Sequence, residues 1–101
     1  MKPINTSGKR KTAIARATLR QGNGIIRING TPIDFVNSKM SRLKLREPLI
    51  LAGDIAGKVD ISVDVVGGGT TSQAEASRLA IAKALVSFTK RDKLKETFLN
   101  Y

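Results

Sequence analysis

The side chains best suited to chemistry in this sequence are cations and backbone donors rather than catalytic groups. Three adjacent cations stand at Lys9-Arg10-Lys11, and three glycines at Gly67-Gly68-Gly69 lead into a helical pattern that begins at Ser72. Cationic side chains and the free N–H groups of a helix N-terminus both attract phosphate. The sequence therefore favours binding of a polyanion at these two stretches.

Groups for catalysis or metal binding are scarce. The chain of 101 residues holds no His and no Cys, which removes the commonest general base and the usual transition-metal ligands. Asp60 and Asp64 are the one close pair of acids, and they alternate along a predicted strand, where a structural role is favoured. The glycine run lacks the Gly-Lys-Ser/Thr ending of a P-loop. We therefore expect no enzyme activity, no cofactor and no metal site.

The charge distribution also favours a polyanion as partner. Eighteen Lys and Arg against eight Asp and Glu give a net charge of +10. Residues 1–50 hold eleven basic and two acidic side chains (+9), whereas residues 51–101 hold seven and six (+1). Of the four aromatic residues, Phe35, Phe88 and Phe98 have the spacing of core residues, so a base-stacking platform is not expected. Binding should depend on phosphate contacts and shape.

The elements that must position these residues follow an α+β order. Residues 59–66 alternate in polarity and predict a half-buried central strand. The glycine turn connects it to a helix over residues 72–88, which places Ala74, Ile81, Leu85 and Phe88 on one face. Residues 12–20 predict another strand whose inward side chains are mostly Ala, so a helix should lie close against it. The simplest architecture is one sheet with helices on one face.

The other strands are expected to pair with segments that are adjacent to them in the sequence. Residues 24–29 should pair with residues 12–20 in a hairpin, and Asn29-Gly30 is a strong tight-turn dipeptide. Residues 31–36 predict a short third strand with Ile33 and Phe35 on one face. Residues 1–8 are expected to be a flexible lead-in or an edge segment.

The helices are expected to be short, apart from the one after the glycines. Asn37-Ser38 offers an N-cap for a helix over residues 39–46, and Glu47-Pro48 should interrupt it. A second short helix over residues 48–52 should end at Gly53. Residues 91–101 predict a terminal helix with Leu94, Phe98 and Tyr101 at helical spacing.

Three arginines share the outer face of the expected hairpin: Arg16, Arg20 and Arg27. They could grip phosphates, or they could pair with Asp60 and Asp64 if the strands are neighbours. Pairing is favoured for Arg16 and Arg27. The role of Arg20 stays open because it sits at the turn.

Taken together, these residues resemble the ribosomal protein S9 family of the small subunit (uS9), in its archaeal or eukaryotic-like form. The similar stretches are residues 7–17 (SGKRKTAIARA), 24–30 (GIIRING), 47–53 (EPLILAG), 67–76 (GGGTTSQAEA) and 80–85 (AIAKAL). The resemblance covers nearly the whole chain. Ser72 stands where the family usually has Gly, and a serine there can also cap the helix.

The resemblance implies one α+β domain over residues 1–101 with the fold of ribosomal protein S5 domain 2. That fold has one mainly antiparallel sheet, helices packed on one face and a left-handed βαβ crossover. The family also implies a structural constituent of the small ribosomal subunit, in the cytoplasm and not at a membrane. Its expected partners are 16S-type rRNA in the subunit head and neighbouring ribosomal proteins. The family's long basic C-terminal tail is absent after Tyr101, so no residue is assigned to tRNA contact.

The residues and the resemblance give one set of candidate rRNA-binding residues: Lys9, Arg10, Lys11, Arg20, Gly67, Gly68, Gly69, Thr70, Thr71, Gln73 and Arg78. Two alternative functions remain open at this point. One is a free-standing basic RNA-binding or chaperone protein, which co-sedimentation with small subunits would discriminate. The other is a phosphoryl-handling enzyme of the same fold, which a phosphorolysis or ATPase assay would detect.

Overall fold

Five strands and two α-helices make up the part of the chain that the computed structural model describes, residues 3–36 and 38–91. The elements are β1 (Ile4–Arg10), β2 (Ala13–Gln21), β3 (Ile26–Ile28), β4 (Thr31–Pro32), the 3-10 helix η1 (Ile33–Phe35), α1 (Lys39–Ala52), the 3-10 helix η2 (Gly53–Lys58), β5 (Val59–Val66) and α2 (Thr70–Arg91). The predicted terminal helix with Leu94, Phe98 and Tyr101 lies outside the described residues.

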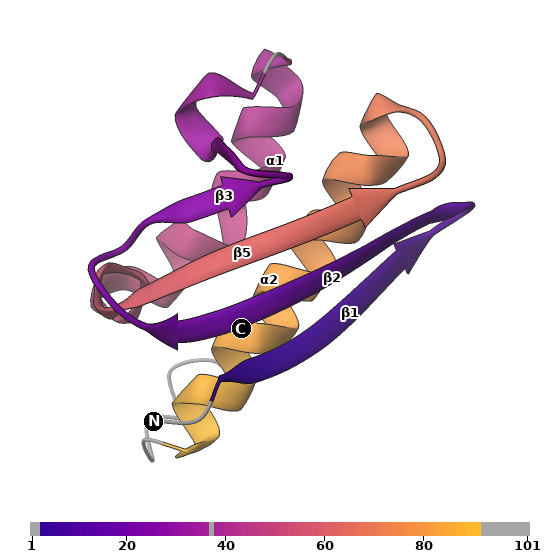
Figure 1. Ribbon diagram of the computed structural model, residues 1–101. Helices are drawn as coiled ribbons and strands as arrows, with labels where there is room; N and C mark the ends of the chain where they lie inside the picture. The colour runs from indigo at the N-terminus through magenta and orange to yellow at the C-terminus, as the bar shows by residue number, and fades with distance from the viewer. Residues whose placement is uncertain (1–2, 37, 92–101) are drawn as a thin grey trace.

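The strands form one sheet in the order β1-β2-β5-β3-β4. Every neighbouring pair is antiparallel except β3 and β5, which are parallel. Both helices lie behind the sheet in Figure 1, so one face of the sheet is open. With β3 above β5, both strands running the same way and α1 behind them, the β3–α1–β5 crossover is left-handed. The expected α+β class, with helices on one face, is confirmed.

The central strand and the long helix form the core, as their sequence patterns predicted. On β5, four alternate residues are buried: Val59, Ile61, Val63 and Val65. The predicted face of α2 is buried against the sheet: Ala74, Ile81, Leu85 and Phe88. Both predictions depended on local periodicity, which tertiary packing did not override.

Small side chains on both sides let α2 lie close to the sheet. The inward residues of β2 are buried, and so are three alanines of α2: Ala76, Ala80 and Ala84. A side chain at Gly8 would begin only 2.8 Å from the backbone nitrogen of Ala80. The expectation of a close helix is therefore confirmed. Residues 4–8 take the second of their two expected roles, because Ile4–Arg10 forms the edge strand β1.

The predicted hairpin between residues 12–20 and 24–29 is wrong. β2 pairs with β1 and β5, and β3 lies on the far side of β5. β5 separates the two strands and satisfies the donors of the loop between them. Gly22 N and Gly24 N donate to the Lys58 and Val59 carbonyls at 2.9 Å, and the Asp60 carboxylate accepts from Ile25 N at 2.9 Å. β5, whose four inward residues are all Val or Ile, therefore lies between the two strands that are neighbours in sequence.

The third strand is also shorter than predicted. Only Thr31 and Pro32 pair with β3, after a tight turn in which Asn29 and Gly30 both have positive φ. The chain then enters η1, where residues two apart no longer share a face. Ile33 is buried while Phe35 is 74% exposed, so the expected core position of Phe35 is wrong.

Helix α1 is continuous where two short helices were predicted. Ser38 caps its start by accepting a hydrogen bond from Ser41 N, and Gly53 ends it with φ of 61°, both as expected. Pro48 lies inside the helix, with its ring fully buried on the same face as Leu45 and Ala52. Packing of that ring against the core offsets the hydrogen bond that a proline removes.

Candidate nucleic-acid interface

The three adjacent cations sit at the tip of the β1–β2 hairpin. Lys9 and Arg10 end β1, and Lys11 occupies the turn with φ of 55°. All three side chains are exposed. A two-residue turn holds them close together at one end of the sheet, at the upper right of Figure 1.

The glycine loop packs directly against this hairpin tip. Gly67 and Gly68 have φ of 80° and 65°, a region that side chains rarely adopt. A Cβ atom at Gly67 would overlap the Thr12 carbonyl oxygen, and one at Gly68 would lie 3.0 Å from the Ala13 Cβ. The backbone that lies close to Gly67 and Gly68 is thus the chain's own. Gly69 differs, because a Cβ there would meet nothing within 4 Å.

Helix α2 begins at this loop, two residues earlier than predicted. Its first hydrogen bond runs from Gln73 N to the Gly69 carbonyl at 2.9 Å, so the preceding N–H groups of the first turn have no partner within the helix. The Gln73 amide also donates to the Gly67 carbonyl at 3.0 Å and braces the loop. Ser72 lies inside the first turn and is not the cap. Thr70 and Thr71 are exposed beside the free N–H groups.

These two stretches form one continuous patch, called here the hairpin–loop surface: residues 9–11 and 67–73. It holds three cations and no acid. The nearest acid is Glu75, which pairs with Arg10 at 2.9 Å and with Lys44 at 3.0 Å. The hydrogen bond from Lys44, and the positive charges around it, hold the pKa of Glu75 below its usual value. Within the described residues, Lys9 and Lys11 have no ion-pair partner, so their charge faces solvent.

Two predicted site residues lie away from this surface. Arg20 is near the other end of β2, opposite Asp60 and about 23 Å along the strand from Ala13. Arg78 is on α2 and donates to Glu47 of α1 at 3.0 Å, and its Nε is buried without a partner. The structure therefore brings nine of the eleven predicted residues together and separates Arg20 and Arg78 from them.

Of the other two arginines on the open face, only Arg16 lies directly opposite a predicted aspartate, and in the described part of the chain neither forms the predicted ion pair. Arg16 is directly opposite Asp64 across β2 and β5, and Arg27 is opposite Ser62 across β3 and β5. No ion pair joins Arg16 or Arg27 to an aspartate within the described residues. Asp60 instead accepts hydrogen bonds from Ile25 N and Asn23 N, and these bonds lower its pKa. Its structural role fits the prediction, although the partner is backbone rather than arginine.

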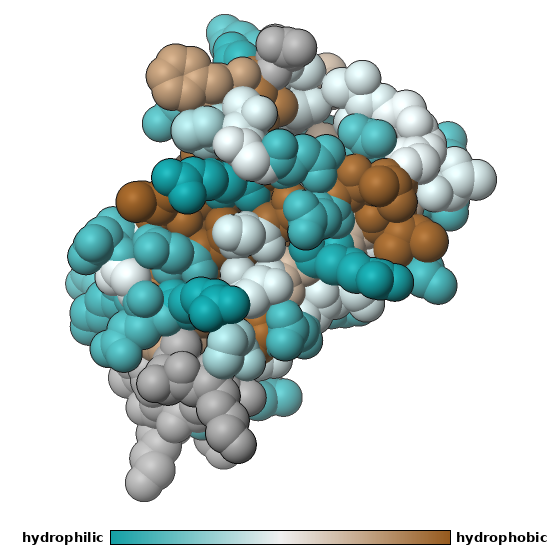
Figure 2. Space-filling view, viewed as in Figure 1, coloured by the Kyte–Doolittle hydropathy of each residue, from teal (hydrophilic) through white to brown (hydrophobic). Residues whose placement is uncertain are grey.

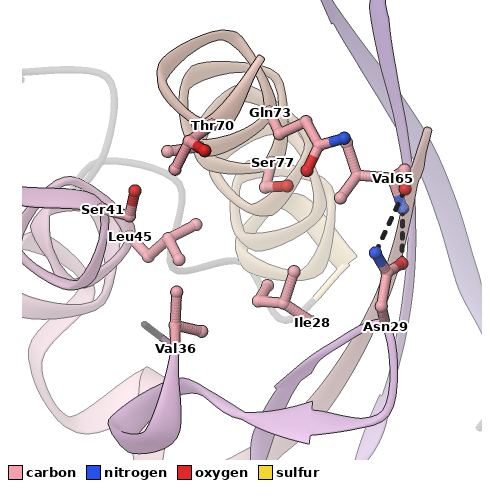
Figure 3. A pocket seen from close by; sticks show the side chains of 10 residues that line it. Ile28, Asn29, Val36, Ser41, Leu45, Val65, Thr70, Gln73 and Ser77 are labelled. Atoms are coloured by element: carbon pink, nitrogen blue, oxygen red, sulfur yellow. Dashed lines mark hydrogen bonds between the residues drawn. The ribbon is translucent and has the colours of Figure 1, made fainter. Parts of the chain in front are cut away.

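A small cleft of about 80 Å³ opens beside the hairpin–loop surface, between the first turns of α1 and α2 (Figure 3). Thr70, Gln73 and Ser77 line it from α2, and Ser41 and Leu45 line it from α1. The Ser77 hydroxyl is buried without a hydrogen-bond partner. No charged side chain lines the cleft, and its volume suits two or three water molecules, at roughly 30 Å³ each.

Asn29 is a positioning residue of this region that the sequence interpretation missed. Its side-chain amide accepts from Val65 N at 2.8 Å and donates to the Val65 carbonyl at 3.1 Å, as the dashed lines in Figure 3 show. These bonds fix the β3–β4 turn to the end of β5, just before the glycine loop. The Asn-Gly dipeptide predicted the turn, but nothing local predicted the partner strand.

Within the described residues, nothing indicates a metal site or a membrane-spanning helix. This part of the chain contains no group of three potential metal-ligating side chains, and none of its helices is long and apolar enough to cross a membrane. The fold and the hairpin–loop surface define a small α+β protein that presents a cationic, acid-free patch suited to a polyanion.

Comparison with known proteins identifies the family. The family model for ribosomal protein S9/S16 matches residues 8–100. The chain is 54% identical to the small ribosomal subunit protein uS9 of Methanococcus vannielii, and 50% identical to that of Methanococcus maripaludis strain C7. Each match covers all 101 residues of this chain and 75% of the relative. The chain therefore belongs to the ribosomal protein S9 family, as its sequence motifs indicated.

Proposed function

We propose that this protein is a structural constituent of the small ribosomal subunit and binds rRNA through the hairpin–loop surface. Family membership supports the ribosomal role, and it favours a structural rather than a catalytic one. The observation that carries the binding site is the packing of the hairpin tip, which bears the unpaired Lys9 and Lys11, against the glycine loop that leads to the free N–H groups of α2. All of these groups prefer a phosphate, and none requires a particular base.

The partners that follow are 16S-type rRNA of the subunit head and adjacent ribosomal proteins, with the ribosome as the site of action. Within the surface, Lys9 and Lys11 supply charge, while Thr70 and Thr71 supply neutral donors. Gly69 leaves room for the RNA backbone. Gly67, Gly68 and Gln73 shape the loop. Arg10 has a second task, because it also pairs with Glu75.

Arg20 and Arg78 are proposed only as peripheral rRNA contacts. Arg20 would reach a phosphate only at the far end of the open sheet face. Arg78 would have to leave Glu47 to do so. We therefore place the principal contact at the hairpin–loop surface and treat these two as peripheral.

Filter binding to an rRNA fragment over a range of salt concentrations tests the proposal. The double variant Lys9→Gln/Lys11→Gln removes two unpartnered cations without breaking the Arg10–Glu75 pair. Removing a single phosphate contact should reduce the log–log salt slope by about 0.7–0.9, so the double variant should reduce it by about 1.4–1.8. The matched control is Lys58→Gln/Lys90→Gln, since both lysines are exposed at the opposite end of the molecule. Equal reductions in the two variants would show diffuse binding and overturn the localised site.

A further inference from the structure

The outer face of α1 carries an exposed apolar stripe that the RNA-binding surface does not use. The stripe consists of Met40 (61% exposed), Leu43 (60%), Ile50 (75%) and Leu51 (44%). At 3.6 residues per turn these positions fall within an arc of about 100°. The opposite face of the helix, with Ser41, Leu45, Pro48 and Ala52, is buried in the core. The side chains of the stripe therefore do not contribute to the hydrophobic core.

Phe35 is a further exposed apolar side chain, on the 3-10 helix that is bonded to α1. Its side chain is 74% exposed, and both residues that flank it are bonded to α1. Asp34 forms an ion pair with Arg46, and the Val36 carbonyl accepts a hydrogen bond from Arg42. These two contacts hold η1 against the helix, and Phe35 lines a shallow hollow with Ile28, Asn29 and Thr31. Five large apolar side chains in one region exceed the scattered exposure that is normal for a monomer.

Most charged residues of this face already have partners within the chain, including Glu47, which lies inside the arc of the stripe between Leu43 and Leu51. Lys44 pairs with Glu75 at 3.0 Å, Glu47 with Arg78 at 3.0 Å, and Arg46 with Asp34. Covering the stripe would therefore strand none of these charges without a counter-charge, which is the main cost of burying charged groups. At the hairpin–loop surface the opposite holds, because Lys9 and Lys11 lack partners within the described residues. The hairpin–loop surface therefore suits an anionic partner, whereas the stripe suits an apolar one.

We propose that the apolar stripe with Phe35 is a docking surface for another protein, one whose apolar segment is flanked by acidic side chains. The proposal rests on the proposed function, in which that protein is a neighbour in the small subunit. Aliphatic side chains offer phosphates no donor, and Phe35 alone provides no stacking platform for RNA. Met and aromatic residues are enriched where protein interfaces are fully buried.

The charge of the rim selects the partner's chemistry. Lys44, Arg46 and Glu47 are paired, whereas Lys39 and Arg42 have no acidic partner within the described residues, so an uncompensated charge of +2 remains beside the stripe. In a two-fold dimer the same patch would face itself, and the two positive rims would repel. A second copy of the chain is therefore disfavoured. A partner with an acidic flank is favoured.

Site-specific photo-crosslinking within assembled subunits tests this surface. The full chain, carrying p-benzoylphenylalanine in place of Leu43, is incorporated into reconstituted small subunits of Methanococcus vannielii. A parallel sample carries the same group in place of Lys11. We expect the Leu43 product to be a protein conjugate that resists ribonuclease, and the Lys11 product to contain RNA. A Leu43 conjugate with RNA, a conjugate with a second copy of this chain, or no conjugate beside a successful Lys11 reaction would each overturn the docking proposal. Failure at Lys11 as well would instead count against the proposed function.

A neutral triple variant provides the matching affinity measurement. Met40→Gln/Leu43→Gln/Ile50→Gln keeps good helix formers on an exposed face and changes no charge. Its retention in subunits should fall by at least about tenfold, while its affinity for naked rRNA should stay within about twofold of the parent. The control is Ile25→Gln/Val66→Gln/Leu79→Gln, which removes three exposed apolar side chains elsewhere. Equal losses in the two triple variants would overturn the assignment.

Discussion

The hairpin–loop surface and the outer face of α1 differ in how the fold treats charge. At the first, Lys9 and Lys11 are exposed with no counter-charge among the described residues, and backbone N–H groups add partial positive charge. At the second, most neighbouring charges are paired internally and the exposed area of the helix is aliphatic. Figure 2 shows the open sheet face, on which apolar residues lie between polar ones and gather most clearly at the right-hand end of the sheet.

The difference teaches that net charge alone does not locate a binding site. Residues 1–50 carry a net +9, yet several of their cations serve the fold. Arg10, Lys44 and Arg46 are each in ion pairs. What distinguishes the proposed RNA site is uncompensated charge beside free backbone donors. What distinguishes the proposed protein site is largely compensated charge beside exposed apolar area.

The largest expected effect separates the two faces of α1. Leu45→Ala removes a side chain that is 1% exposed in the core and should cost about 2–5 kcal/mol in the free energy of unfolding. Leu43→Ala, two residues away on the exposed stripe, should change it by no more than about 0.5 kcal/mol. Urea unfolding of both variants measures the contrast. A large loss for Leu43→Ala would mean that the stripe serves the fold, which would break the comparison.

A smaller effect is expected from one added charge at the hairpin–loop surface. Gly69 is the loop position for this test, since Gly67 and Gly68 require positive φ while Gly69 has open space around it. Asp and Asn are equally good helix N-caps, so Gly69→Asp and Gly69→Asn should both fold well. A carboxylate about 4 Å from a phosphate costs about 1 kcal/mol in water, so Gly69→Asp should bind RNA roughly fivefold more weakly than Gly69→Asn.

The control for that experiment uses a glycine at the far end of the molecule. Gly57 is exposed in η2, and a side chain there would also meet nothing within 4 Å. Gly57→Asp and Gly57→Asn differ by the same charge as the Gly69 pair. Filter binding should separate the Gly69 variants clearly and the Gly57 variants little. If both pairs differ equally, the field of the whole protein rather than a local site decides RNA affinity.

The smallest expected effect concerns Glu75, which links the two regions through Arg10 and Lys44. The hydrogen bond from Lys44 is the main cause of its lowered pKa, and nearby positive charges add to it. A carboxyl whose pKa is lower in the folded state stabilises the fold above its unfolded pKa, and this stabilisation is lost as the pH falls through the folded pKa. Glu75→Gln should therefore be slightly less stable than the parent at neutral pH.

The same difference should shrink when both proteins are unfolded at about pH 3, below the ordinary range of a glutamate carboxyl. Urea denaturation at the two pH values measures it, and added salt should weaken it in the same way. A stability difference that is unchanged by both acid and salt would show that packing of the side chain, rather than its charge, matters.

The elements with strong internal periodicity could be predicted, because a spacing of two residues indicates a strand and a spacing of three to four residues indicates a helix. The alternation of Val59, Ile61, Val63 and Val65 defined β5, and the face with Ile81 and Leu85 defined α2. The Asn-Gly turn and the glycine at the end of α1 followed from backbone conformations that few other residues adopt.

The interior of α1 could not be predicted, because proline normally ends a helix and only the packing of Pro48 shows why this one continues. The position of Phe35 failed for a related reason. Its spacing from Ile33 fits a strand, and the sequence gives no sign that the chain coils into a 3-10 helix after Pro32. In both places a tertiary contact outweighed a local rule.

The sequence by itself determined the family, the α+β class, the core faces of β5 and α2, and the two stretches that compose the proposed RNA site. These properties depend on residue type and spacing along one segment. Only the tertiary structure decided that β5 lies between β2 and β3, that Gly67 packs on Thr12, and that Arg20 lies remote from Lys11. Strand order and side-chain pairing depend on which distant segments bury the most apolar surface together, and no local pattern encodes that competition.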